Sequence, residues 1–139
     1  MTSVRFKSSK DSLNRITFGL FLSVLAILVM GFGKPKYSSI QVKDDNSKQQ
    51  MIFQVVPTEN MAINADAPWK LEITEAKGVD LPTRKFGKEQ LNEDIPGYAV
   101  KLNKAKEKSG SIAYKFIAFI CTKDKTQCYR EVHNLKHTW

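Results

Sequence analysis

SIAYKFIAFICT, residues 111–122, is the longest hydrophobic run beyond residue 33. It is rich in β-branched and aromatic residues on both faces, which is typical of a central strand covered on two sides. The polar turn KDKTQ (123–127) follows it and leads into CYREVHNLKHTW (128–139), which we predict to be a final, more polar strand. The two segments are therefore expected to pair as an antiparallel hairpin.

Shorter strand signals precede this hairpin. MIFQVVP (51–57) predicts a strand that ends at its proline, and both APWKLEITEA (67–76) and YAVKLNK (98–104) alternate with a period of two residues. Residues 77–97 hold three glycines and two prolines, so they are expected to be mostly loop. The side chains predicted to share buried faces are Trp69, Leu71 and Ile73, and Tyr98, Val100 and Leu102. Since no segment here has a helical period, we predict an all-β antiparallel sandwich over residues 51–139.

The N-terminus has the pattern of a membrane anchor. Residues 1–15 carry four basic residues and one acid, and residues 16–33 carry no charge. A helix over that uncharged run would be about 27 Å long, close to the thickness of a bilayer's hydrocarbon core. We therefore predict an uncleaved signal anchor, a single transmembrane helix, at 16–33. A cleaved signal peptide is the alternative.

The flanking charges predict the orientation of this anchor. Because four basic residues precede the span, the positive-inside rule places residues 1–15 in the cytoplasm as a basic tail. We expect an inner-membrane, single-pass protein whose C-terminal domain is periplasmic. Residues 34–50 are polar and are expected to be a linker. Export would place both cysteines in an oxidising compartment, where disulfides persist.

Charge also limits the classes of partner. The part beyond residue 33 keeps 18 of the 22 basic residues and 13 of the 14 acidic ones, and the two signs are interleaved. A nucleic-acid-binding domain would have a more concentrated basic patch. We therefore expect no nucleic-acid partner and interpret the charge as a solvated surface near anionic headgroups.

Cys121 and Cys128, the two cysteines of the chain, allow three interpretations. In the predicted hairpin they lie opposite one another, at a distance that permits a disulfide. Such a bridge could be a structural staple or a redox-active pair; as a staple, closing so short a loop would stabilise the fold by about 2.5 kcal/mol. The third interpretation is a zinc site with His133 and His137. On a strand those histidines would be about 13 Å apart, so we expect no metal and no cofactor.

Three segments carry a resemblance to a known family: INADAPWKLEI (63–73), DLPTRKFGKEQ (80–90) and YKFIAFICTKDKTQCYRE (114–131). Together they resemble the N-terminal domain of the thiol:disulfide interchange protein DsbD and the small exported domains related to it. The resemblance implies an immunoglobulin-like sandwich. It also implies that Cys121 and Cys128 take the positions of the cysteines that pass electrons to periplasmic partners. Phe86 is the candidate for the aromatic residue that caps the disulfide in that family.

Two functions remain open from the sequence. The first is an interaction or scaffold domain without enzymatic activity, in which the disulfide only staples the hairpin. The alternative is a module that exchanges thiols and disulfides through Cys121 and Cys128. Both imply the inner membrane and a periplasmic protein as partners, and nothing in the sequence indicates a small-molecule substrate.

Overall fold

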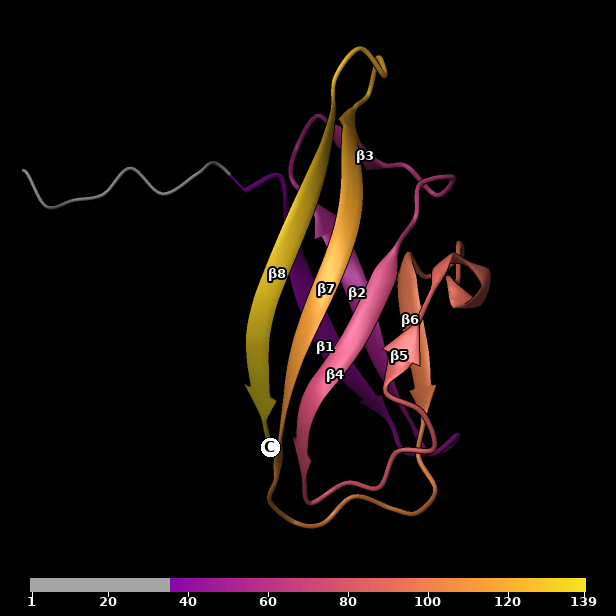
Figure 1. Cartoon of the computed structure of the whole chain (residues 1–139), viewed down its shortest axis with the longest axis vertical. Helices are drawn as coiled ribbons and strands as arrows, with labels where there is room; N and C mark the ends of the chain where they lie inside the picture. The colour runs from indigo at the N-terminus through magenta and orange to yellow at the C-terminus, as the bar shows by residue number, and fades with distance from the viewer. Residues whose placement is uncertain (1–35) are drawn as a thin grey trace, which may run out of the picture. The chain divides into compact units, whose positions relative to one another are not determined.

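Two antiparallel sheets form the described part of the protein, residues 36–139 of a computed structural model. The cytoplasmic tail and the membrane span predicted at 1–33 lie outside these residues. Within 36–139, no helix has the length and apolar character needed to cross a bilayer. Figure 1 shows three strands side by side, β8 (Cys128–Thr138), β7 (Ser111–Thr122) and β4 (Lys70–Lys77), in front of β1 (Ser38–Asp45) and β2 (Gln50–Pro57).

The smaller sheet has the strand order β1-β2-β6. Its strands are β1 (Ser38–Asp45), β2 (Gln50–Pro57) and β6 (Gly97–Lys101). Strands β1 and β2 pair along their whole length, from Ser38 opposite Pro57 to Asp45 opposite Gln50. Gly97 allows β6 to approach β2, because a Cβ atom there would lie 1.8 Å from the carbonyl oxygen of Phe53.

The larger sheet is built around β7 (Ser111–Thr122). Strand β8 (Cys128–Thr138) follows β7 through eleven register pairs, from Ser111 opposite Thr138 to Cys121 opposite Cys128. On the other side of β7 lie β3 (Met61–Ile63) and β4 (Lys70–Lys77), and β4 also pairs with β5 (Lys85–Phe86). A short 3₁₀ helix, η1 (Lys88–Gln90), follows β5. The hairpin predicted from the sequence is confirmed, with the predicted strand bounds to within one residue.

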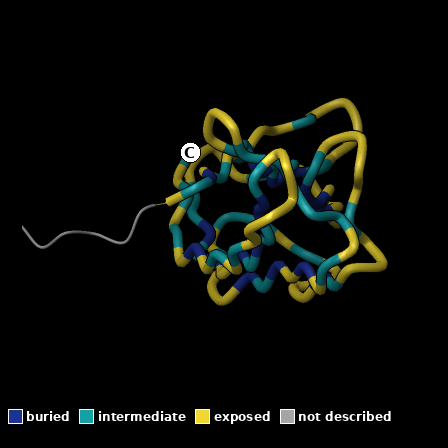
Figure 2. The backbone as a smooth tube through the Cα atoms, turned by 90° about the horizontal axis from the view of Figure 1, so that it is seen from above, coloured by how far each residue is buried: buried dark blue, intermediate teal, exposed yellow. Residues whose placement is uncertain are grey.

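The core lies between the two sheets. Phe116 of β7 is fully buried, with its ring centroid 6.0 Å from that of Trp69 and 5.5 Å from that of Tyr98. Phe53 of β2 meets Tyr114 edge-on at 5.0 Å, which joins the sheets at a second point. Figure 2 shows exposed turns around these buried strand positions. The predicted inward faces are confirmed, since Trp69, Leu71, Ile73, Tyr98 and Val100 are buried, while Leu102 packs against the core at its margin.

One expectation about β7 is wrong. The strand is central in the sheet, but its two faces are not equally covered: Ile112, Tyr114, Phe116, Ala118 and Ile120 are buried, and the opposite face is mostly half-buried or exposed. The sequence shows apolar residues on both faces because Ile117 and Phe119 lie on the outer one. No second layer covers that outer face within residues 36–139.

The predicted linker at 34–50 is also wrong. Residues 38–45 form β1, and the compact unit begins at Lys36. The segment has few large apolar groups because β1 is an edge strand that presents only Ser38, Ile40 and Val42 to the interior in alternation. An edge strand with so few inward side chains has a sequence that resembles a polar tether.

A buried polar cluster ties β1 to β8. Ser38 and His133 are each 4% exposed, and the Ser38 hydroxyl donates to the Glu131 carboxylate and lies 3.1 Å from Nε2 of His133. The backbone N–H of Tyr37 donates to Glu131 Oε1 at 2.6 Å, and the Tyr37 ring stacks on Tyr129 at 4.2 Å. This Ser38–Glu131–His133 cluster therefore closes one side of the sandwich through hydrogen bonds.

The cluster predicts a pH dependence of stability. Burial lowers the pKa of His133 below its ordinary value of 6.5, with a further contribution from Lys36, although the Glu131 carboxylate acts in the opposite direction. The folded state then prefers the neutral imidazole. The stabilisation from His133 is therefore complete above the pKa that its imidazole has in the unfolded chain, and it is lost as the pH falls through the pKa in the folded state.

We expect the free energy of unfolding to drop more steeply between pH 7 and pH 5 in the wild type than in His133→Gln. Urea denaturation across this range measures it. The His137→Gln variant is the matched control and should keep the wild-type slope; equal slopes in all three proteins would contradict the assignment.

Candidate functional site

A disulfide joins Cys121 and Cys128 at the end of the β7–β8 pair. The two residues are register partners, as the predicted hairpin requires, and their Cα atoms are 4.0 Å apart. Side chains opposite each other in an antiparallel pair point to the same face, and faces alternate along a strand. Because Ile120 points into the core, the disulfide belongs to the outer face of the sheet, together with Phe119 and Arg130.

The turn between the cysteines is ordered by its own hydrogen bonds. Thr122 and Thr126 donate from their hydroxyls to the Asp124 carboxylate, and the backbone N–H of Thr126 donates to it at 3.1 Å. Gln127 donates from its backbone N–H to the Thr122 hydroxyl, and its backbone oxygen accepts from the Thr122 N–H at 2.9 Å. The donors from Thr122 and Thr126 lower the pKa of the Asp124 carboxyl group, and the Thr122 hydroxyl is the largest cause. Lys125 takes a positive φ of 59° so that the chain can reverse.

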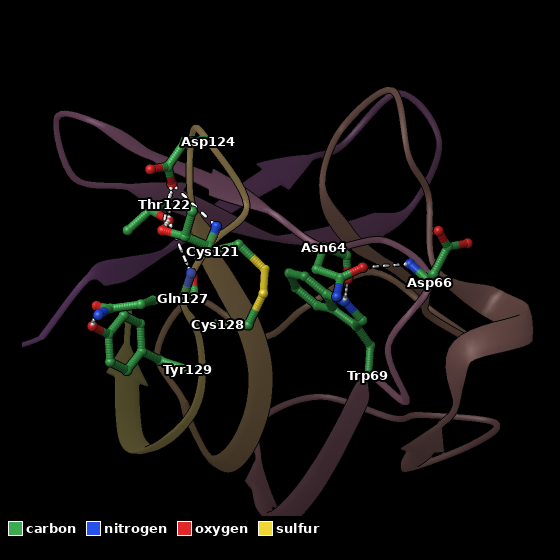
Figure 3. Close-up of a disulfide and its surroundings, with 10 residues drawn as sticks. Asn64, Asp66, Trp69, Cys121, Thr122, Asp124, Gln127, Cys128 and Tyr129 are labelled. Atoms are coloured by element: carbon green, nitrogen blue, oxygen red, sulfur yellow. Dashed lines mark hydrogen bonds between the residues drawn. A yellow bond between two sulfur atoms is a disulfide. The ribbon is translucent and has the colours of Figure 1, made fainter.

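The two cysteines differ in their access to solvent. Cys121 is 4% exposed, whereas Cys128 is an exposed residue. Both line a surface hollow of about 430 Å³, whose other walls are residues 62–66 and Lys125. Figure 3 shows the sulfur atoms on the side of Asn64 and Trp69, away from the hydrogen bonds of the turn.

The segment that forms the wall of the hollow is held in place at both ends. Ala62 of β3 is the register partner of Cys121, and the backbone N–H of Asn64 donates to the carbonyl of Phe119 at 2.9 Å. The Asn64 carbonyl in turn accepts from the indole N–H of Trp69 at 2.6 Å. A rigid wall therefore stands beside the disulfide and leaves the Cys128 side accessible.

The charges at the hollow are few. Of its lining residues, Lys125 carries a positive charge and Asp66 a negative one, and the remaining side chains are neutral. A neighbouring ammonium group favours a thiolate over a thiol. Lys125 is the one basic residue among those that line the hollow.

The proposed cap residue, Phe86, lies elsewhere. It is buried on β5 opposite Leu71, with its ring 5.9 Å from that of Tyr98. Leu71 is in turn opposite Phe116, five residues before Cys121 on β7. Phe86 is therefore a core residue, and the expectation that it covers the disulfide is wrong; the segment 62–66 flanks the disulfide instead.

Sequence reasoning missed the Ser38–Glu131–His133 cluster. It contains the residue types of a hydrolytic triad, but Glu131 contacts the Ser38 hydroxyl and the same imidazole nitrogen, Nε2, that faces Ser38. In a triad the acid orients the opposite ring nitrogen and leaves the serine free to attack. The buried Ser38 is therefore a structural hydrogen-bond donor. The available sequence signal was the spacing of Glu131 and His133, two polar residues on one face of a predicted strand.

The zinc interpretation is not supported by the positions of the two histidines. Both lie on β8, as the sequence predicts, and His133 takes part in the Ser38–Glu131–His133 cluster. His137 lies opposite Ile112, with its ring 6.0 Å from that of Trp139. Across residues 36–139, no three His, Cys, Asp or Glu side chains converge in a way that would hold a metal ion.

Comparisons with known proteins identify no relative. The chain matches no protein-family model, no curated protein and no solved structure.

The position of the disulfide predicts how much it stabilises the fold. Removing it in the double variant Cys121→Ser/Cys128→Ser releases only an eight-residue loop in the unfolded chain, so we expect the free energy of unfolding to fall by about 2.5 kcal/mol. The β7–β8 register and the core remain, so the variant should still fold cooperatively. Urea denaturation followed by circular dichroism measures both quantities, with reduced wild-type protein as the control. A double variant that is unfolded in the absence of urea would contradict this expectation.

Proposed function

We propose that this protein is an inner-membrane-anchored, periplasmic domain of the DsbD N-terminal-like type that exchanges disulfides with partner proteins through Cys121 and Cys128. The observation that carries the proposal is the exposure of Cys128 at the rim of a hollow, next to the buried Cys121. The two antiparallel sheets are compatible with the immunoglobulin-like topology that the sequence resemblance implies.

The exchange begins at Cys128, the exposed residue of the pair. A partner thiolate attacks Sγ of Cys128, a disulfide forms between the partner and Cys128, and Cys121 leaves as a thiolate that takes up a proton. The partner's second thiolate then attacks its own sulfur in the mixed disulfide and releases Cys128. The partner loses two electrons and two protons and becomes a disulfide, while this domain gains them and becomes a dithiol. The reverse sequence oxidises the domain.

The location of the disulfide supports a role beyond stapling. In the chain-entropy model, a bridge across an eight-residue loop stabilises by about 2.5 kcal/mol, roughly half the effect of a bridge across a 100-residue loop. The two strands are also already held by eleven register pairs and by the hydrogen bonds of the turn. The hairpin is therefore already defined by contacts other than the disulfide, and the exposed Cys128 lies where a partner can reach it.

A second candidate function is an interaction or scaffold domain in which the disulfide only staples the hairpin. The burial of Cys121 favours the scaffold function, because burial in apolar surroundings disfavours the thiolate that must leave during exchange. This candidate keeps the same anchor, compartment and periplasmic protein partner. It differs in the chemistry expected of the cysteine pair.

The reduction potential separates the two functions. We expect a midpoint between roughly −120 and −270 mV, the range of thiol oxidoreductases, because exchange requires a disulfide that partners can reduce. Titration of the full chain against a dithiothreitol redox buffer, read out by thiol alkylation and mass spectrometry, measures it. A midpoint below roughly −300 mV would support the staple.

The difference in exposure predicts which variant traps a partner. In Cys121→Ser the exposed Cys128 can form a mixed disulfide that no internal thiol resolves, so we expect it to accumulate covalent complexes in the periplasm. The matched variant, Cys128→Ser, leaves only the buried thiol and should trap several-fold less. Non-reducing electrophoresis followed by mass spectrometry identifies the complexes. Equal trapping by both variants, or more by Cys128→Ser, would reverse the order of attack.

The proposed compartment has its own test. We expect the expressed chain to fractionate with the inner membrane at its full length, because residues 16–33 form an uncharged run long enough to span it. A protease added to spheroplasts reaches only the periplasmic side of the inner membrane, and it should then digest the C-terminal domain. A soluble mature protein beginning near Lys34 would replace the anchor by a cleaved signal peptide and leave the exchange function intact.

A further inference from the structure

The outer face of the β7–β8 pair, which has no assigned role so far, carries an apolar centre with a basic rim. Ile117, Phe119 and Val132 form the centre: Ile117 and Val132 are register partners, and Phe119 lies opposite Arg130. Val132 is 38% exposed and is one of two large apolar side chains exposed to this degree among residues 36–139; Ile117 and Phe119 are half-buried. Lys115, Arg130 and Lys136 surround the centre, and all three are exposed.

We propose that this surface, formed by Lys115, Ile117, Phe119, Arg130, Val132 and Lys136, is the docking site for an acidic partner protein that delivers its thiols to Cys128. The inference rests on the proposed exchange function and names the chemistry of its partner. The surface is continuous with the disulfide, because Arg130 follows Cys128 by two residues on the same face of β8. A partner covering the apolar centre therefore has its contact surface next to the exposed residue Cys128.

The charges of this face determine the kind of partner. Within residues 36–139, none of Lys115, Arg130 and Lys136 has a carboxylate oxygen within 4.0 Å. The acid of the neighbouring strand, Glu72, is opposite Lys115 but pairs with Lys85 at 3.3 Å and with Lys70 at 3.8 Å. The positive charge of the surface is thus left for a partner, and complementary charge accelerates and orients docking.

The same charges argue against a second copy of this chain on the surface. Two identical basic faces brought together would place like charges opposite each other, which costs several kcal/mol. Ile117, Phe119 and Val132 form a contiguous apolar row across two strands, and contact with a protein would remove this row from water. An acidic protein surface with an apolar middle satisfies both features.

Two model peptides test the preference. Each has one cysteine between leucines, flanked by glutamates in one peptide and by lysines in the other. For each peptide we measure the rate at which its thiol opens the disulfide of the full chain in neutral bicelles. We divide this rate by the rate at which the same peptide reduces bis(2-hydroxyethyl) disulfide, an uncharged substrate. This division removes the effect of the flanking charges on the thiol itself. We expect the acidic peptide to react about tenfold faster after this correction at low ionic strength, and the ratio to fall towards one near 0.5 M salt.

Matched variants locate the effect. Arg130→Glu/Lys136→Glu should invert the preference, whereas Lys43→Glu/Lys101→Glu changes the net charge equally on the outer face of the other sheet and should retain it. Val132→Ser should slow the acidic peptide several-fold and leave the reaction with dithiothreitol unchanged. Equal corrected rates of the two peptides in the wild type, or the same loss in both double variants, would overturn the docking site.

A binding measurement keeps this result separate from the exchange function. Serine versions of both peptides are titrated into isotope-labelled protein, and amide shifts on β8 are followed by NMR. Suppose that the amides around Val132 shift with the acidic peptide but that no thiol opens the disulfide. The docking site would then be retained and the exchange function rejected. If the same amides shift when anionic phosphatidylglycerol is added to the bicelles and do not shift with either peptide, the surface contacts lipid and the proposal is wrong.

Discussion

The eleven-pair register between β7 and β8 is the constraint on which the rest of the structure depends. In a strand, a shift by one residue would exchange the buried and exposed faces. The observed register places Phe116 and its neighbours in the core, Cys121 opposite Cys128, and His133 where Ser38 of β1 can reach it. Core, disulfide and closure of the sandwich therefore follow from one alignment of two strands.

This alignment also explains why the larger sheet has two chemically different faces. The inner face packs aromatic rings from both sheets, with Phe53 against Tyr114 and Trp69 against Phe116. The outer face keeps a smaller apolar row and exposed bases beside the disulfide. No second layer covers that face within residues 36–139, and it is on this uncovered apolar row and its basic rim that the proposed docking of an acidic partner rests.

The asymmetry within the cysteine pair has the same origin. Cys121 ends the central strand, next to β3 and the segment 62–66, whereas Cys128 begins an edge strand next to a solvated turn. The disulfide thus joins a buried cysteine to an exposed one. In the exchange proposed above, that difference would make Cys128 the attacked residue and Cys121 the leaving group.

The sequence by itself determined the hairpin, the inward faces of two strands and the opposition of the cysteines, because alternation and turn residues act between neighbours in the chain. It did not determine β1, the position of Phe86 or the Ser38–Glu131–His133 cluster. The polar segment 38–45 becomes a strand only because β2 supplies its hydrogen bonds, and Phe86 is buried because β5 pairs with β4. Ser38 and His133 are 95 residues apart, so only the packing of one sheet on the other could bring them together. The same holds for the exposure of Cys128, since the neighbours that cover one cysteine and leave the other open come from segments distant in sequence.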